Sequence, residues 1–291
     1  MKYKLPQHKR HKKPRPKKIR KRFKKPIPRV VVPSFFTLMN LFCGFVAIIQ
    51  IHEGKLEFGA WLIIFAGLFD ALDGFMARLA NATSSFGIEL DSLSDVVSFG
   101  VAPGFLLYSF SFNQLSTPGI IISTLPAICG AVRLARFNVE TKEVVIDYFR
   151  GLPIPAQASM IVAFFLTFNG ELYFFEDLKY GVNGILIPMV VLLSLLMVST
   201  VPFDKIPRFS RGYVKKHRGR VILFVGYFLA IIFFQEYGLM AVFTIFIGKG
   251  IVMAGYQLWN DLQNNGEDDN DEDILIVDER YDNDAFRVDR F

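Results

Sequence analysis

Cysteine is scarce in this sequence, with Cys43 and Cys129 the two examples among 291 residues. Two thiols cannot build a disulfide framework, and both lie in apolar runs, which predicts buried free thiols. Acidic residues are missing from residues 1–30, which carry 15 Lys/Arg, whereas residues 260–291 carry 12 Asp/Glu and only 3 Lys/Arg. The 229 residues between hold 15 charges of each sign, so the net charge of +6 describes the two ends rather than the middle.

The composition excludes two classes of protein. Hydrophobic residues make up 52% and aromatic residues 15% of the chain, with a mean hydropathy of +0.34. That is too apolar for an ordinary soluble domain and for a chain that is disordered throughout. We also expect no signal peptide, because the first apolar run lacks a small-residue cleavage site and belongs to a longer membrane pattern.

The charged ends predict two disordered tails around a membrane domain. Proline and like-charge repulsion disfavour a helix in residues 1–30, which we expect to be a cytoplasmic tail that sets topology and touches anionic lipid. Nucleic acid is not an expected partner, because no pattern of interleaved aromatic residues and no binding fold supports it. Residues 260–291 are expected to form an acidic, disordered cytoplasmic tail, which leaves 31–259 as the membrane domain.

The apolar middle predicts an all-α, polytopic membrane protein with about eight transmembrane helices. Each helix needs about 20 mostly apolar residues to cross the hydrocarbon core of a bilayer. The expected spans are Ser34–Ile51, Phe58–Ala80, Ser92–Phe112, Gly119–Ala135, Ile154–Phe168, Gly184–Val201, Val221–Phe234 and Gly238–Leu258. The polar pair Gln235-Glu236 separates the last two spans.

Basic residues set the expected orientation of these spans. With the N-terminal tail in the cytoplasm, the outer connections contain only Lys55 and Lys179. The inner connections Arg136–Arg150 and Pro202–Arg220 carry three and seven Lys/Arg. We therefore expect an integral protein of the cytoplasmic membrane with both termini on the cytoplasmic side.

Four carboxylates interrupt the second and third spans, where a charge is costly. Asp70 and Asp73 stand at i and i+3, and Asp91 and Asp95 at i and i+4, so each pair shares a helix face. A short turn makes the two helices antiparallel neighbours, and both pairs fall near the cytoplasmic end. The sequence therefore predicts that all four converge, although any single one could be a helix cap or an interhelical hydrogen-bonding group.

Four carboxylates without matching basic residues predict a metal site. Oxygen-only ligation favours Mg²⁺, Mn²⁺ or Ca²⁺ over zinc. Two divalent ions would neutralise the four negative charges and would suit pyrophosphate chemistry.

The carboxylates belong to a longer motif. It reads Asp70-x2-Asp73-Gly74-x2-Ala77-Arg78-x8-Gly87-x3-Asp91-x3-Asp95. This string resembles the signature of the CDP-alcohol phosphatidyltransferase family at every fixed position, and the resemblance covers roughly Pro33–Leu258. It implies a membrane enzyme that transfers a phosphatidyl-type group from a CDP-linked donor to an alcohol and releases CMP.

The resemblance also implies a role for each residue of the motif. The four aspartates would hold Mg²⁺ or Mn²⁺, two ions in all, and Asp91 and Asp95 would be catalytic, with Asp95 as the base for the acceptor hydroxyl. The donor would be bound by Gly74 and Ala77, which let the nucleotide approach, and by Arg78 at its phosphates. Gly87 would allow tight helix packing.

Two polar residues of the first span are expected on the same side of the membrane. Thr37 and Asn40 stand at i and i+3 and share a face. Their side chains either form interhelical hydrogen bonds or, as the resemblance implies, contact the CDP donor.

A further set of residues bears on the acceptor. Arg133 and Arg136, at i and i+3 in the fourth span, either snorkel to lipid phosphate or bind the acceptor together with Asn138. The segment Gly151–Ala156 could wall that pocket or merely start a helix. Together these stretches resemble the phosphatidylserine synthase branch of the family. That resemblance implies CDP-diacylglycerol and L-serine as substrates and a possible homodimer.

Three alternatives stay open from sequence. The acceptor could be glycerol 3-phosphate or another alcohol, because the aspartate motif is shared by relatives with other acceptors. The protein could instead be a cation transporter or a membrane anchor whose tails recruit partners, although acids gathered at one membrane face argue against an ion path.

None of the four histidines begins a His-x-Lys-x4-Asp string, which favours direct displacement over a phosphohistidine intermediate.

Overall fold

The computed structural model describes residues 31–80, 84–140, 149–170, 175, 179–203 and 218–268. The tail predicted for residues 1–30 lies outside the described residues, as does most of the predicted acidic tail, from residue 269 onward.

Helices dominate the described part of the chain. The first half holds α1 (Val31–His52), α2 (Leu56–Ala80), α3 (Ser85–Asp95), the π-helical η1 (Val96–Val101), α4 (Ala102–Phe110) and the 3₁₀ turn η2 (Phe112–Leu115). The second half holds α5 (Thr117–Glu140), α6 (Ile154–Phe168), α7 (Asn183–Val198) and α9 (Arg218–Asp268). Two short strands, β1 (Phe149–Arg150) and β2 (Pro202–Phe203), pair antiparallel. The predicted all-α class is confirmed.

Five helices are long and apolar enough to cross a membrane within the described ranges. They are Pro33–His52, Leu56–Leu79, Ser85–Phe110, Thr117–Val139 and Phe233–Tyr256, and α6 and α7 are shorter apolar helices. The chain is therefore a polytopic helical membrane protein. The segments expected as the seventh and eighth spans form the two arms of α9, which separate at a kink where Gln235 takes φ 47° and ψ −119°.

Two helix boundaries differ most from the predicted ones. The third span begins at Ser85 rather than Ser92, because Ser84 caps the helix and its Oγ accepts a hydrogen bond from the Gly87 N–H at 3.0 Å. Helix α9 continues to Asp268, into the segment expected as a tail, since no proline interrupts the chain after Gly250.

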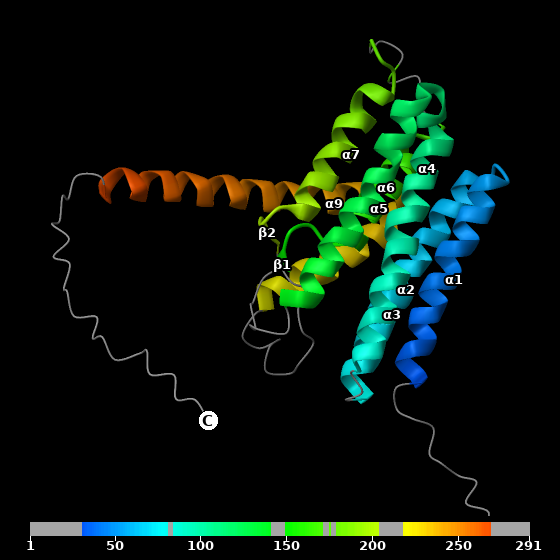
Figure 1. The fold of residues 1–291 in the computed structure, drawn as a ribbon, viewed down its shortest axis with the longest axis horizontal. Helices are drawn as coiled ribbons and strands as arrows, with labels where there is room; N and C mark the ends of the chain where they lie inside the picture. Colours follow the sequence, from blue (N-terminus) through cyan, green and yellow to red (C-terminus); the bar gives the residue numbers. More distant parts are fainter. Residues whose placement is uncertain are drawn as a thin grey trace, which may run out of the picture.

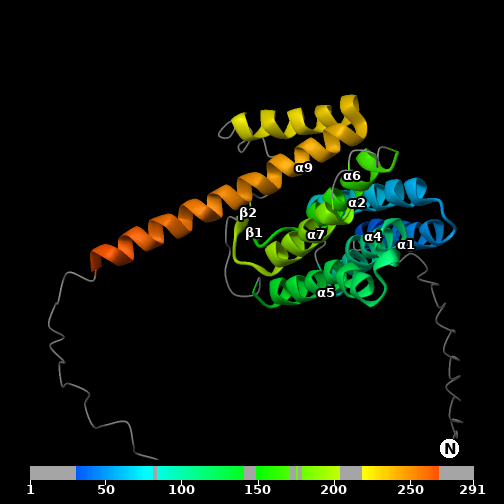
Figure 2. The ribbon, with the colours of Figure 1, turned by 90° about the horizontal axis from the view of Figure 1, so that it is seen from above.

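The helices α1 to α7 run up and down in one bundle, and the last arm of α9 leaves it sideways (Figure 1). Viewed from above, the two arms of α9 fold back on one another beside the bundle (Figure 2). Helices α1 and α2 form a closely packed antiparallel hairpin, and α1 also packs against α3, η1 and α4. The second and third spans are thereby held beside the first.

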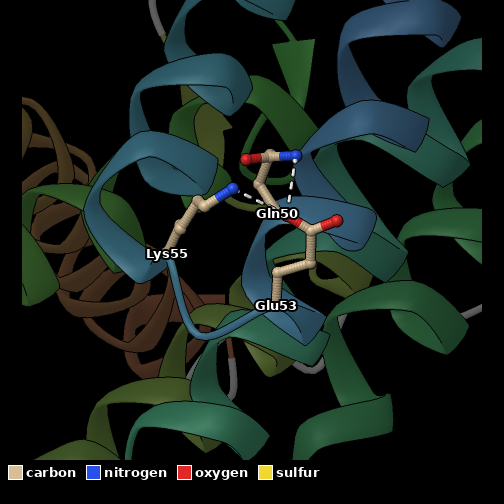
Figure 3. Close-up of polar contacts among 3 residues, drawn as sticks. All are labelled: Gln50, Glu53 and Lys55. Carbon is tan, nitrogen blue, oxygen red and sulfur yellow. Dashed lines mark hydrogen bonds and ion pairs between the residues drawn. The ribbon is translucent and has the colours of Figure 1, made fainter.

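The turn between α1 and α2 is closed by polar residues at its tip (Figure 3). Lys55 Nζ lies 2.8 Å from Glu53 Oε2, and Gln50 Nε2 donates to the same oxygen at 3.4 Å. The hydrogen bond from Lys55 and its charge lower the pKa of Glu53. Both partners are exposed, so the pair fixes the geometry of the turn more than it stabilises the fold.

Small residues allow the first span to approach its neighbours. A Cβ at Gly44 of α1 would overlap with the Ser98 side chain and would lie 2.7 Å from the Ser98 Cα. The opposite face of α1 carries Phe35, Phe42 and Phe45, each more than half exposed, as expected for side chains that face lipid. Close backbone contact through small residues is the usual way in which membrane helices associate.

Replacing Gly44 is therefore expected to weaken the bundle. In Gly44→Ala the added methyl meets backbone atoms of η1, so we expect a lower Tm of the detergent-solubilised protein, despite a gain of about 1 kcal/mol in helix propensity. Gly67→Ala in α2 is the matched control, because its Cβ would find Phe99 at an ordinary 3.8 Å. A Gly44→Ala protein as stable as Gly67→Ala would contradict this account of the packing.

Candidate active site

Three of the predicted carboxylates converge between α2 and α3. Asp70, Asp91 and Asp95 each offer one oxygen, and these three oxygens lie within 4.8 Å of one another. Asp95 is buried, and the other two are partly buried. At such distances the negative charges repel strongly in a medium of low dielectric constant, so the arrangement calls for bound cations.

Asp73 lies at the edge of this group. Its carboxyl neighbours Thr37 and Asp91, and Arg78 is the cation that acts on its charge. Asp73 Oδ2 and Asp91 Oδ1 are buried and have no hydrogen-bond partner among the described residues. Buried carboxylate oxygens without donors are the atoms that a divalent cation takes as ligands, so the residues present fit a metal site.

Helix α1 supplies the polar wall on one side of the aspartates. Asn40 is fully buried, and its Nδ2 donates to Asp95 Oδ1 at 3.1 Å. Thr37 lies beside Asp73, and its hydroxyl donates to the Pro33 carbonyl at 3.2 Å. Both residues thus border the aspartate group, as their shared helix face indicated.

Helix α5 brings its arginines to the other side. Arg133 lies close enough to Asp95 and to Arg136 for their charges to interact, and its Nε is buried without a hydrogen-bond partner in the part of the chain described. Arg136 Nη1 donates to the Val198 carbonyl of α7 at 3.1 Å. Arg133 is therefore the α5 arginine that lies close enough to the aspartates for its charge to act on Asp95.

The remaining residues of the predicted set have the following surroundings in this structure. Asn138 Nδ2 donates to Ser92 Oγ at 2.9 Å and ties α5 to α3. A Cβ at Gly74 would meet Arg78 Nη1 at 3.6 Å, which leaves room beside Asp73. Ala77 is partly buried on the same helix. A Cβ at Gly87 would meet Ser84 Oγ at 3.2 Å, so the predicted role of Gly87 in close helix packing stays a prediction.

The segment Gly151–Ala156 packs against the end of α7. Gly151 has φ +77°, and its N–H donates to the Val201 carbonyl at 2.8 Å. The Leu152 N–H donates to the Leu196 carbonyl at 3.0 Å. A side chain at residue 151 would collide with the Met197 carbonyl, so the turn requires glycine.

Sequence reasoning missed two buried polar residues, one of which contacts Asn40 at the site. Ser98 lies on η1, and its Oγ donates to the Asn40 carbonyl at 3.0 Å. Gln157 of α6 is fully buried, and neither of its side-chain polar atoms has a partner within the described residues. A polar residue inside an apolar run was the available signal for both.

Comparison with known proteins gives one consistent result. The family model for CDP-alcohol phosphatidyltransferase matches residues 30–201. A Helicobacter pylori protein named CDP-diacylglycerol–serine O-phosphatidyltransferase is 34% identical over 226 residues, which is 77% of this chain and 91% of the relative. Proteins of the same name from Methanocaldococcus jannaschii and Bacillus subtilis are each 38% identical. Their alignments cover 61% and 62% of this chain, and 76% and 92% of the relatives.

A divalent cation is expected to stabilise the folded protein through the converging aspartates. Saturating Mg²⁺ or Mn²⁺ should raise the Tm by on the order of 5 °C, because binding to the native state alone adds about 2–3 kcal/mol at 100 times the Kd. Asp91→Asn should raise the Tm in chelator, since it removes one repelling charge, and should shrink the response to metal.

Glu89→Gln on the exposed face of α3 is the matched control for that measurement. It removes one charge from the same helix away from the cluster, so its metal response should equal that of the wild type. An equal metal response in Asp91→Asn would rule out a metal site at these aspartates.

Proposed function

The chain belongs to the CDP-alcohol phosphatidyltransferase family, and from that membership we propose that it transfers the phosphatidyl group of CDP-diacylglycerol to L-serine. The products are phosphatidylserine and CMP. The names of its relatives support this activity. The observation that carries it is the group of converging aspartates, two of which have buried, unpartnered oxygens, close to the partly buried Arg133.

The aspartates provide the metal ligands in this proposal. Asp70, Asp73, Asp91 and Asp95 would hold two divalent cations, Mg²⁺ or Mn²⁺, which would neutralise the charge of the donor pyrophosphate. A transporter would have no use for a CDP-linked lipid, so the family membership favours the enzyme over the ion path.

The protein's own groups position the donor. Arg78, the exposed arginine beside Asp73, binds donor phosphate. Gly74 has no side chain and Ala77 only a methyl group, so the nucleotide can approach the backbone of α2 closely. Thr37 borders the same space from α1. Fixing the phosphate in line with the incoming hydroxyl supplies much of the rate enhancement in phosphoryl transfer.

The chemical step is a direct displacement. The hydroxyl oxygen of serine bonds to the phosphatidyl phosphorus while the bond from that phosphorus to the CMP oxygen breaks. Asp95 takes the hydroxyl proton, with Asp91 one turn before it on the same helix face. The released CMP carries the electron pair of the broken bond on its phosphate.

Arg133 gives the site its selectivity for serine. The serine carboxylate needs a cationic partner near the metal ligands, and the guanidinium of Arg133 is already placed beside Asp95. Arg136 stands one turn further along α5 and is braced by the Val198 carbonyl. Two adjacent arginines also suit a phosphate group, which makes glycerol 3-phosphate the competing acceptor.

The reaction takes place at a membrane surface in this proposal. We place the aspartates at the cytoplasmic face of the cytoplasmic membrane, with both termini in the cytoplasm. Residues 31–259 form the catalytic membrane domain between two tails, within the lipid bilayer that supplies the donor. A homodimer is the proposed assembly.

A CMP-release assay with several acceptors tests the function. Purified protein with CDP-diacylglycerol and Mg²⁺ or Mn²⁺ should release CMP with L-serine at least about tenfold faster than with glycerol 3-phosphate or inositol phosphate. Chelator should abolish release, and added metal should restore it. The reverse ranking of acceptors would refute the serine assignment while leaving the transferase chemistry intact.

Arg133 is expected to govern the KM for serine. Arg133→Lys keeps the charge but loses the planar fork, so the serine KM should rise by about tenfold or more while the KM for CDP-diacylglycerol stays within about twofold. Arg136→Lys should raise the serine KM less, because part of its guanidinium is engaged by α7. Unchanged serine kinetics in both variants would move the acceptor pocket elsewhere.

A further inference from the structure

Asn40 contacts the proposed base directly. Its amide Nδ2 donates to Asp95 Oδ1 at 3.1 Å, across the interface between α1 and α3. Asn40 is fully buried, and Asp95 is 7% exposed. A donor on one oxygen fixes the rotation of a carboxylate and leaves the second oxygen for other partners.

The backbone of Asn40 is anchored as well. Ser98 Oγ donates to the Asn40 carbonyl at 3.0 Å, and Ser98 stands one turn beyond Asp95 on the same helix face. Gly44, one turn beyond Asn40, lets the two helices approach until a Cβ there would overlap with Ser98. Ser98 belongs to the π-helical segment that begins directly after Asp95, and such segments often occur at functional sites.

We infer that Asn40 is a positioning residue for Asp95 and not a ligand of the CDP donor. The inference rests on the proposed function, in which Asp95 takes the proton of the acceptor hydroxyl. The amide of Asn40 holds Oδ1, which leaves Oδ2 and the second lone pair of Oδ1 for the metal and the acceptor hydroxyl. The hydrogen bond commits Nδ2 of Asn40 to Asp95, and Asn40 Oδ1, which has no partner among the described residues, is an acceptor that does not bind an anionic phosphate.

The test separates turnover from donor binding. Asn40→Leu keeps a similar volume and removes the amide, and Asn40→Asp keeps the shape but replaces the donor with an acceptor. Both should lower kcat by about 10–100-fold, the usual effect of losing a group that orients a ligand or base. The KM for CDP-diacylglycerol, and the rise in Tm that CDP-diacylglycerol causes, should stay near those of the wild type.

Ser98→Ala covers the case in which the Asn40 variants do not fold. It leaves the amide in place and removes only the anchor of its backbone, so kcat should fall by less than in Asn40→Leu. Thr167→Val is the matched control on α6: it also removes a buried hydroxyl that bonds across helices, to the Glu236 carbonyl at 3.4 Å, and its kcat should equal that of the wild type.

Two results would overturn the inference. One is a KM for CDP-diacylglycerol raised about tenfold in Asn40→Leu with kcat unchanged, which would make Asn40 a donor ligand. The other is a kcat lower in Ser98→Ala than in Asn40→Leu, which would make the backbone contact the important one. A wild-type protein that prefers another acceptor would refute the serine assignment alone, because the variants can then be compared with that acceptor.

Discussion

The mutual repulsion of carboxylates inside an apolar bundle is the constraint on which this structure depends. Oxygens of Asp70, Asp91 and Asp95 lie within 4.8 Å of one another, in a place where water can solvate them only in part. Two arginines of the described chain act on the group, Arg78 on Asp73 and Arg133 on Asp95. Two positive charges do not balance four negative ones, so the group keeps a net negative charge that bound cations would compensate.

The first span shows how packing serves that site. Its outer face is aromatic and exposed, and its inner face carries Thr37, Asn40 and Gly44 against the helix that holds Asp95. The glycine permits the approach, and the approach brings the amide within hydrogen-bonding distance of the carboxylate. Helix contact and the orientation of the Asp95 carboxylate are therefore one feature of the structure, because a wider spacing of α1 would release both.

Helix α5 connects the neighbourhood of the aspartates to α7 and α3. The charge of Arg133 acts on Asp95, Arg136 is bound to the end of α7, and Asn138 is bound to Ser92 of α3. These three residues have different partners although they stand within six positions of one another. In the proposed function, Arg133 is the residue that recognises a small carboxylate, because Arg136 and Asn138 bind to other helices.

The sequence by itself determined the all-α membrane class, the family and the identity of the aspartates, because hydropathy and the i, i+3 and i, i+4 spacings are local properties. The break at Gln235 followed from the same local pattern. Tertiary structure alone decided which partner each polar residue meets. Spacing placed Thr37, Asn40, Arg133 and Arg136 near the site, but it could not assign Asn40 to Asp95, Arg136 to the Val198 carbonyl or Asn138 to Ser92. Those assignments depend on how closely the helices approach one another. Residues more than fifty positions apart in the chain, such as Gly44 and Ser98, set these separations, and no local sequence pattern encodes them.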